Sequence, residues 1–130
     1  MTFQLSERSK KRRSGVDPRL IEISDLAINI TKIDFGHPEH SGMRSAEEQF
    51  ELFRMGRSKA DGYKKLSRHQ TGLALDFYAF VDGKASWEKE HLAMVACAFL
   101  QAASILGYQL EWGGLWRSFQ DYPHVQLLEK

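Results

Sequence analysis

The feature that most constrains the fold is a long apolar segment at residues 86–106. Leu92, Ala96 and Phe99 recur at steps of four and three residues, which is the spacing of one helical face, and a glycine ends the segment. Its middle is apolar nearly all round, as is typical of a helix buried in a core. The rest of a 130-residue chain must pack around this helix, so we expect one domain over residues 1–130.

Shorter patterns predict further elements on both sides of this segment. Asp17 followed by a proline is a typical helix start, and Ser45 with Glu48 forms a capping box at the start of another helix. Apolar or alternating stretches predict strands at residues 33–35, 73–81, 108–112 and 124–128. Because helices come first and strands later, we expect an α+β fold with a small antiparallel sheet packed against helices.

The amino-terminal segment, residues 1–14, is polar and strongly basic. No apolar stretch follows its charges, so we expect a solvated, partly ordered arm and no secretory signal. The alternative is an arm that contacts a polyanion and binds nucleic acid in a salt-sensitive way. A net charge of +1 gives no support to a nucleic-acid partner. The longest apolar run, residues 93–100, is too short to span a bilayer, so we expect no stable membrane association.

Three residues stand out because their surroundings do not explain them. Asp76 lies inside an apolar stretch, where an unpaired carboxylate is costly, while His69 follows a polar loop and His124 opens the last predicted strand. Two imidazoles and a carboxylate are a typical ligand set for a catalytic zinc ion, with the fourth position left for water. On one straight strand His69 and Asp76 would lie about 23 Å apart, at roughly 3.3 Å per residue. The chain must therefore turn back between them, and Gly72 permits such a turn.

Two further residues suit the chemistry of such a centre. Asp121 would lie near the metal without binding it, accept a proton from the attacking water and pass it to the leaving amine. We expect residues 121–124 to be extended, because Pro123 keeps the preceding residue out of the α region. Arg44 is the best-placed cation for a carbonyl oxygen or a substrate carboxylate, since a guanidinium forks onto planar acids.

Each of these positions also has an ordinary structural explanation. His69 can be a surface histidine, and His124 a strand histidine bonded to a neighbour. Asp76 can be a buried acid paired with a backbone amide or an arginine. Asp121 can be a turn residue before a proline, and Arg44 a surface charge beside a helix. From the residues alone, both explanations stay open at every position.

Several segments together resemble one known family. Residues 67–76 (Ser-Arg-His-Gln-Thr-Gly-Leu-Ala-Leu-Asp) resemble the Ser-x-His-x-x-Gly-x-Ala-x-Asp signature of VanY-like D-alanyl-D-alanine carboxypeptidases and phage L-alanyl-D-glutamate endolysins. Residues 111–116 and 121–126 resemble the Trp-Gly-Gly-x-Trp and Asp-x-Pro-His blocks of these zinc peptidases, and residues 42–49 resemble their Gly-x-Arg-x-x-x-x-Gln segment. The resemblance covers nearly the whole chain and implies a hedgehog/D,D-peptidase-like fold.

The resemblance also implies a role for the residue at each matching position. His69, Asp76 and His124 would bind one Zn²⁺ per chain. Asp121 would be the catalytic acid or base, and Arg44 would be a catalytic and substrate-binding cation. Ser67 would line the site. Three aromatic residues could form a substrate wall, with core packing as the alternative: Trp112, Trp116 and Tyr122. His37 and His40 lie in a loop, and we expect them to face solvent.

The function that follows is zinc-dependent hydrolysis of peptidoglycan stem peptides. We expect a monomeric phage or prophage endolysin that cleaves the L-alanyl-D-glutamate bond. Such a protein is made in the host cytoplasm and acts on the wall from the periplasm, with the help of a membrane-permeabilising, holin-type partner. The alternatives are a D-alanyl-D-alanine carboxypeptidase and a non-catalytic, zinc-containing binding module on the same fold.

Overall fold

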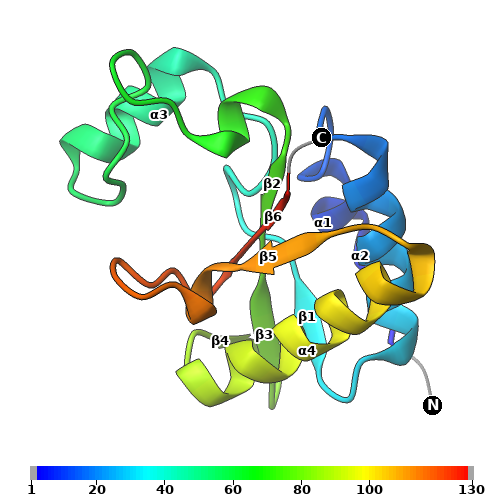
Figure 1. Ribbon diagram of the computed structural model, residues 1–130. Helices are drawn as coiled ribbons and strands as arrows, with labels where there is room; N and C mark the ends of the chain where they lie inside the picture. Colours follow the sequence, from blue (N-terminus) through cyan, green and yellow to red (C-terminus); the bar gives the residue numbers. More distant parts are fainter. Residues whose placement is uncertain (1–2, 129–130) are drawn as a thin grey trace.

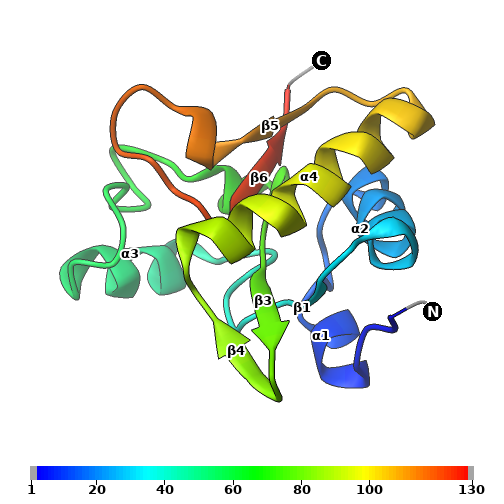
Figure 2. The same ribbon diagram turned by 90° about the horizontal axis from the view of Figure 1, so that it is seen from below.

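Helix α4 (Lys89–Leu106) is the longest helix in the computed structural model, which describes residues 3–128 (Figure 1). Its buried side chains form the centre of the core, and α2 (Pro18–Ile30) packs beside it in both views (Figure 2). The core helix was predicted, but its predicted start at residue 86 is three residues too early. Ser86 is instead the last residue of a strand, and Glu88 occupies the N-cap position of the helix. The helix is also not buried all round, because Met94, Cys97 and Ile105 lie on an exposed face.

Two three-stranded antiparallel sheets pack against the helices. The first has the order β1 (Asp34–Gly36), β3 (Tyr78–Val81) and β4 (Lys84–Ser86). The second has the order β2 (Ala74–Asp76), β6 (His124–Leu127) and β5 (Leu110–Trp112). The predicted α+β class is confirmed, and the single small sheet that we expected is two sheets.

The predicted strand at residues 73–81 is divided between these two sheets. Asp76 donates its N–H to the carbonyl of Ser41, and Phe77 donates its N–H to the carbonyl of Pro123. Phe77 is fully buried, and its ring stacks on Phe99 of α4 with 5.2 Å between the ring centroids. Apolar residues lie on both sides of Asp76 in the sequence, so the pattern predicts one strand, and periodicity does not show the break between β2 and β3.

The basic amino-terminal segment is folded onto the body of the protein. It contains α1 (Glu7–Lys11), and Leu5 is part of the core. The side chain of Arg13 is buried and lies 2.7 Å from Asp25, while Ser9 Oγ accepts the backbone N–H of His37. The expected solvated arm is therefore wrong, because these anchoring residues bury their side chains between the exposed basic ones.

The remaining elements place loops around the second sheet. Helix α3 (Ala46–Arg54) begins with the predicted capping box of Ser45 and Glu48. Two short 3-10 helices, η1 (Arg68–Thr71) and η2 (Gly113–Leu115), precede β2 and follow β5. In both views α3 and the loop after η2 lie on the side of the molecule opposite to α1 and α2 (Figures 1 and 2). Within residues 3–128, no helix has the length and apolar character needed to cross a membrane.

Candidate metal centre

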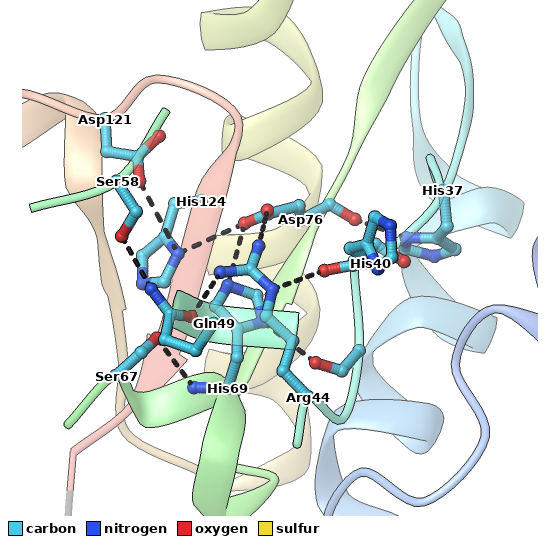
Figure 3. Close-up of polar contacts among 12 residues, drawn as sticks. His37, His40, Arg44, Gln49, Ser58, Ser67, His69, Asp76, Asp121 and His124 are labelled. Atoms are coloured by element: carbon cyan, nitrogen blue, oxygen red, sulfur yellow. Dashed lines mark hydrogen bonds and ion pairs between the residues drawn. The ribbon is translucent and has the colours of Figure 1, made fainter. Parts of the chain in front are cut away.

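The side chains of His69, Asp76 and His124 converge at the second sheet (Figure 3). Asp76 at the end of β2 lies directly opposite His124 at the start of β6, so strand pairing brings these two together. His69 belongs to η1, which ends at Gly72 with a φ of +77°. The left-handed conformation of this glycine turns the chain back toward β2, as predicted from the sequence.

Both imidazoles face the same carboxylate oxygen. His69 Nε2 lies 3.2 Å from Asp76 Oδ1, and His124 Nδ1 lies 3.1 Å from it. All three candidate ligand atoms lie within 4.8 Å of one another. Both histidines are buried, so little of either ring is exposed to bulk water.

In each ring, the nitrogen that faces away from Asp76 makes a hydrogen bond, and this bond determines which ring nitrogen carries the proton. His69 Nδ1 lies 3.0 Å from the carbonyl oxygen of Gly42, which can only accept, so Nδ1 carries the proton. His124 Nε2 lies 2.8 Å from Gln126 Oε1, and Gln126 in turn donates its amide to Glu111. In the neutral rings, His69 Nε2 and His124 Nδ1 therefore point lone pairs toward a carboxylate. Two lone pairs and a carboxylate oxygen that face one another can together bind a cation. The hydrogen bonds at His69 Nδ1 and His124 Nε2 are typical of histidines that bind a metal.

Asp76 is held in its ionised form by these neighbours. Burial alone would raise its pKa, but His69 and His124 outweigh burial and hold the pKa well below its ordinary value. For His124 the balance is similar: burial lowers its pKa, and the hydrogen bond and charge of Asp76 raise it above the ordinary value. The carboxylate is thus available as an anionic ligand throughout the neutral pH range.

Asp121 lies beside this cluster without belonging to it. Its Oδ2 is 3.8 Å from His124 Nδ1, and its side chain remains about half exposed. Residues 121–124 form a turn in which the carbonyl of Asp121 accepts the N–H of His124, so the expected extended conformation is wrong. Burial, followed by repulsion from Asp76, raises the pKa of Asp121 above its ordinary value. A carboxylate with a raised pKa at the edge of such a centre is suited to accepting and returning a proton.

The side chain of Arg44 makes three hydrogen bonds within the protein. Its Nη2 donates to Asp76 Oδ2 at 3.1 Å, its Nη1 to Gln49 Oε1 at 3.0 Å and its Nε to the carbonyl of His40 at 2.7 Å. Its side chain is only 10% exposed, and burial lowers its pKa despite the nearby carboxylates. Arg44 therefore fixes the second oxygen of Asp76, and it also lines the cleft, so its predicted role toward a substrate group stays a prediction.

Gln49 links Arg44 to the loop that follows α3. It is fully buried, accepts from Arg44, and donates its amide to Ser58 Oγ at 2.7 Å and to the carbonyl of Ala60 at 2.8 Å. The sequence analysis gave this residue no role beyond its place in a motif. A glutamine on the inward face of an amphipathic helix was the available signal, because a buried amide requires partners.

His37 also differs from its expected exposed position, because it is fully buried directly behind Asp76. Its Nδ1 donates to the carbonyl of Asp76 at 2.6 Å, and its Nε2 lies 2.9 Å from Ser24 Oγ. Burial lowers the pKa of His37 to about 4. His40 is exposed as expected, with its Nδ1 3.3 Å from Glu48.

The centre opens into a cleft of about 1130 Å³. Ser67 and Trp116 line this cleft as predicted; Ser67 Oγ also caps η1, and the Trp116 ring lies 5.3 Å from that of His124. Trp112 and Tyr122 do not line the cleft and instead show the core packing given as the alternative. Trp112 donates its indole N–H to the carbonyl of Tyr122 at 2.7 Å, and the two rings pack edge to face against the core.

Three aromatic residues without a predicted role line the cleft instead: Tyr78, Trp87 and Phe119. Tyr78 belongs to β3, and Trp87 follows β4, with their rings 5.9 Å apart. They come from the first sheet, whereas the metal-centre residues come mainly from the second. Only the packing of the two sheets brings these rings to the same cleft.

Comparison with known proteins gives consistent matches over nearly the whole chain. The model of the family described as phage L-alanyl-D-glutamate peptidase matches residues 1–127. The L-alanyl-D-glutamate peptidase of Escherichia phage T5 is 31% identical over 123 residues, which are 94% of this chain and 88% of that protein. The crystal structure of the L-Ala D-Glu endopeptidase ChiX from Serratia marcescens superposes with a TM-score of 0.83 at 36% identity, covering 96% of this chain and 90% of that one.

A bacterial relative matches over a shorter region. The peptidoglycan L-alanyl-D-glutamate endopeptidase CwlK of Bacillus subtilis strain 168 is 35% identical over 98 residues. These residues are 67% of this chain and 58% of CwlK, so the similarity covers only part of that protein.

Proposed function

Because the chain belongs to the family of phage L-alanyl-D-glutamate peptidases, we propose that it is a zinc-dependent hydrolase of peptidoglycan stem peptides that cleaves the bond between L-alanine and D-glutamate. The observation that carries this proposal is the convergence of two imidazole lone pairs on one carboxylate oxygen at the base of an open cleft. The activities of its relatives in Escherichia phage T5, Bacillus subtilis and Serratia marcescens support the choice of bond.

In this proposal His69, Asp76 and His124 hold one zinc ion. Zinc suits the site because two histidines and a carboxylate are a usual ligand set for catalytic zinc, and the hydrogen bonds to Gly42 and Gln126 present the correct nitrogens. When bound, zinc supplies Lewis acidity, which lowers the pKa of water and polarises a carbonyl group.

The protein's own residues supply proton transfer and orientation. Asp121 accepts a proton from the water that attacks the scissile carbonyl, and it returns a proton to the amine nitrogen of D-glutamate as the bond breaks. Its position beside His124, outside the three ligand residues, suits this role. Arg44 is a positioning residue in this scheme, since it holds Asp76.

Metal analysis and product mapping test the proposal together. The purified chain should contain about one zinc ion, lose activity on Gram-negative sacculi after chelation and regain it when zinc is restored. On purified stem tetrapeptides and pentapeptides, mass spectrometry should show cleavage after L-alanine. Release of terminal D-alanine alone would identify a D-alanyl-D-alanine carboxypeptidase, and zinc binding without cleavage of any peptide would identify a binding module.

The biological setting is part of the same proposal. The similarity to the phage T5 enzyme supports a role as a phage or prophage endolysin that acts on the cell wall. We expect it to act as a monomer. We expect lysis to require a holin-type partner that permeabilises the inner membrane. Expression in Escherichia coli with and without such a partner tests this, because lysis by the chain alone would contradict it.

A further inference from the structure

Positive charge is concentrated at the cleft. Seven basic and three acidic side chains line it, although the whole chain has a net charge of only +1. Two of the three acidic residues, Asp76 and Asp121, belong to the metal centre. The basic residues are Arg8, Arg12, Arg44, Arg57, Lys59, Lys65 and Arg68. A cleft with this charge favours a substrate that carries carboxylates.

Most of these cations are already engaged with protein groups. Arg12 and Arg68 each donate to a backbone carbonyl, and Lys59 lies over the ring of Phe119 at 5.1 Å from its centroid. Arg44 is committed to Asp76, as described above. Arg57, by contrast, is exposed, and within residues 3–128 its side chain makes no hydrogen bond or ion pair.

The backbone of Arg57 is held firmly although its side chain is free. The preceding Gly56 has a φ of +77°, and the N–H of Arg57 donates to the carbonyl of Leu52 at 2.8 Å, which closes the end of α3. On the other side, Gln49 binds Ser58 and Ala60. The chain at Arg57 is therefore fixed from both directions, and through Gln49 it is tied to Arg44.

A chain of hydrogen bonds also ties the neighbourhood of Arg57 to the metal centre. Ser58, the next residue, accepts from Gln49 at 2.7 Å. Gln49 accepts from Arg44 at 3.0 Å, and Arg44 donates to Asp76 at 3.1 Å. Arg8 and Lys65 are also exposed and line the cleft, but neither is adjacent in sequence to a residue that the side chain of Gln49 binds. Of these three exposed cations, Arg57 is thus the one that this chain of hydrogen bonds fixes relative to the metal centre.

We propose that Arg57 binds the free carboxylate of the D-glutamate residue whose amine is released by cleavage. This inference rests on the proposed function. D-glutamate has two carboxyl groups, and only one of them continues the stem peptide, so the other is free unless it is amidated. A guanidinium pairs with such a carboxylate through two parallel hydrogen bonds, and it has no equivalent pairing with a neutral amide. The structure therefore assigns to Arg57 the selection of unamidated stem peptides.

Two synthetic peptides test this selection. They contain the L-alanyl-D-glutamate bond and differ only in whether the free carboxyl of D-glutamate is a carboxylate or an amide. The zinc-loaded chain should cleave the carboxylate peptide with a kcat/KM at least about tenfold higher, which is the usual size of a charge-assisted hydrogen-bond pair. In Arg57→Gln the ratio of the two kcat/KM values should fall to about one, and in Arg57→Lys it should be intermediate.

A control variant and a binding measurement make the outcomes separable. Arg54→Gln removes a charge of α3 that pairs with Glu51 and does not line the cleft, so it should keep the wild-type ratio. The inference would be overturned if the ratio of the two kcat/KM values were near one in the wild type, or if a high ratio persisted in Arg57→Gln. In both cases, cleavage of the peptides would still support the proposed function. If neither peptide is cleaved, the proposed function fails, and calorimetric binding of the two intact peptides decides the inference alone. Equal affinities would then overturn it, and a preference for the carboxylate that Arg57→Gln removes would support it.

Discussion

Asp76 and Asp121 both lie within 4 Å of the His124 ring, yet their surroundings give them opposite properties. The pKa of Asp76 is held low by two imidazoles, whereas partial burial and repulsion from Asp76 raise that of Asp121. Two carboxylates whose pKa values are pushed apart suit two roles, one as a permanent anion and one as a proton carrier. This difference between neighbouring residues underlies our assignment of Asp121 as the acid and base.

Replacing Asp121 should stop catalysis without removing the metal. In Asp121→Asn we expect turnover of stem peptides to fall at least ~100-fold, because proton transfer contributes about this much. Zinc content and thermal unfolding should stay near wild type, since Asp121 is not among the three converging ligand atoms. Asp82→Asn, in the distant β3–β4 turn, is the matched control and should keep full activity. An unchanged rate in Asp121→Asn would show that another group is the base.

Gln126 should affect the affinity for the metal although it is not one of the three candidate ligands. Its Oε1 accepts from His124 Nε2, which leaves Nδ1 free to bind. We expect Gln126→Leu to weaken zinc binding about 10- to 100-fold, as is usual when such a supporting hydrogen bond is lost. Competition with a chromogenic chelator measures this directly. Gln120→Leu, in the exposed loop, is the control, and equal zinc affinity in both variants would contradict the proposed tautomer.

At the level of secondary-structure elements, η2 packs closely against the turn before β6, and a glycine of η2 makes this close contact possible. The carbonyl of Gly113 accepts the N–H of Asp121, and a Cβ built on Gly113 would lie 2.3 Å from the carbonyl oxygen of Asp121. No side chain can be accommodated there unless the turn moves. The short segment between β5 and β6 thus places the proton carrier by backbone contact.

Gly113→Ala should therefore displace the turn that carries Asp121. We expect a loss of stability of about 1–3 kcal/mol, which is typical of overpacking, together with a fall in kcat larger than the change in zinc affinity. Gly83→Asn is the control, because Gly83 has open space around it and asparagine tolerates its positive φ. Urea unfolding and steady-state kinetics provide the two measurements. Wild-type kinetics in Gly113→Ala would show that the turn adapts.

For the molecule as a whole, the metal centre is supported from behind by the amino-terminal half of the chain. His37 joins Ser24 of α2 to the backbone of Asp76, and Ser9 of α1 binds the N–H of His37. The segment that resembled a loose arm is therefore linked through one buried histidine to the strand that carries a metal ligand.

This buried histidine should make stability depend on pH. The folded state keeps His37 neutral down to about pH 4, whereas the unfolded chain binds a proton below pH 6.5. Because the unfolded state then binds more protons, the free energy of unfolding should fall by about 3 kcal/mol between pH 7 and pH 4 through this residue alone. Urea unfolding of the metal-free protein at several pH values measures the effect.

Two variants isolate the contribution of His37. His37→Gln should remove this part of the pH dependence, whereas His40→Gln should keep it, because His40 is exposed. If the wild type and His37→Gln lose the same stability between pH 7 and pH 4, the buried neutral state assigned to His37 is wrong.

Much of this protein could be predicted from the chain alone, because the signals were local. Periodicity indicated α2, α3 and α4, and the capping box of Ser45 and Glu48 marked the start of α3. Asp76 was conspicuous since a carboxylate in an apolar strand needs a partner, and the motifs around it indicated the family. Residue type and spacing are sufficient for such features, since they depend on neighbours a few positions away.

Only the tertiary structure decided which residues face the metal centre and which support it from behind by hydrogen bonds. The sequence could not reveal that Arg44 binds Asp76, that His37 lies behind it, or that Trp87 replaces Trp112 at the cleft. It also could not show that the run at residues 73–81 enters two sheets, because apolar residues lie on both sides of Asp76. These facts depend on contacts between segments far apart in the chain, and such contacts leave no periodic trace in the sequence.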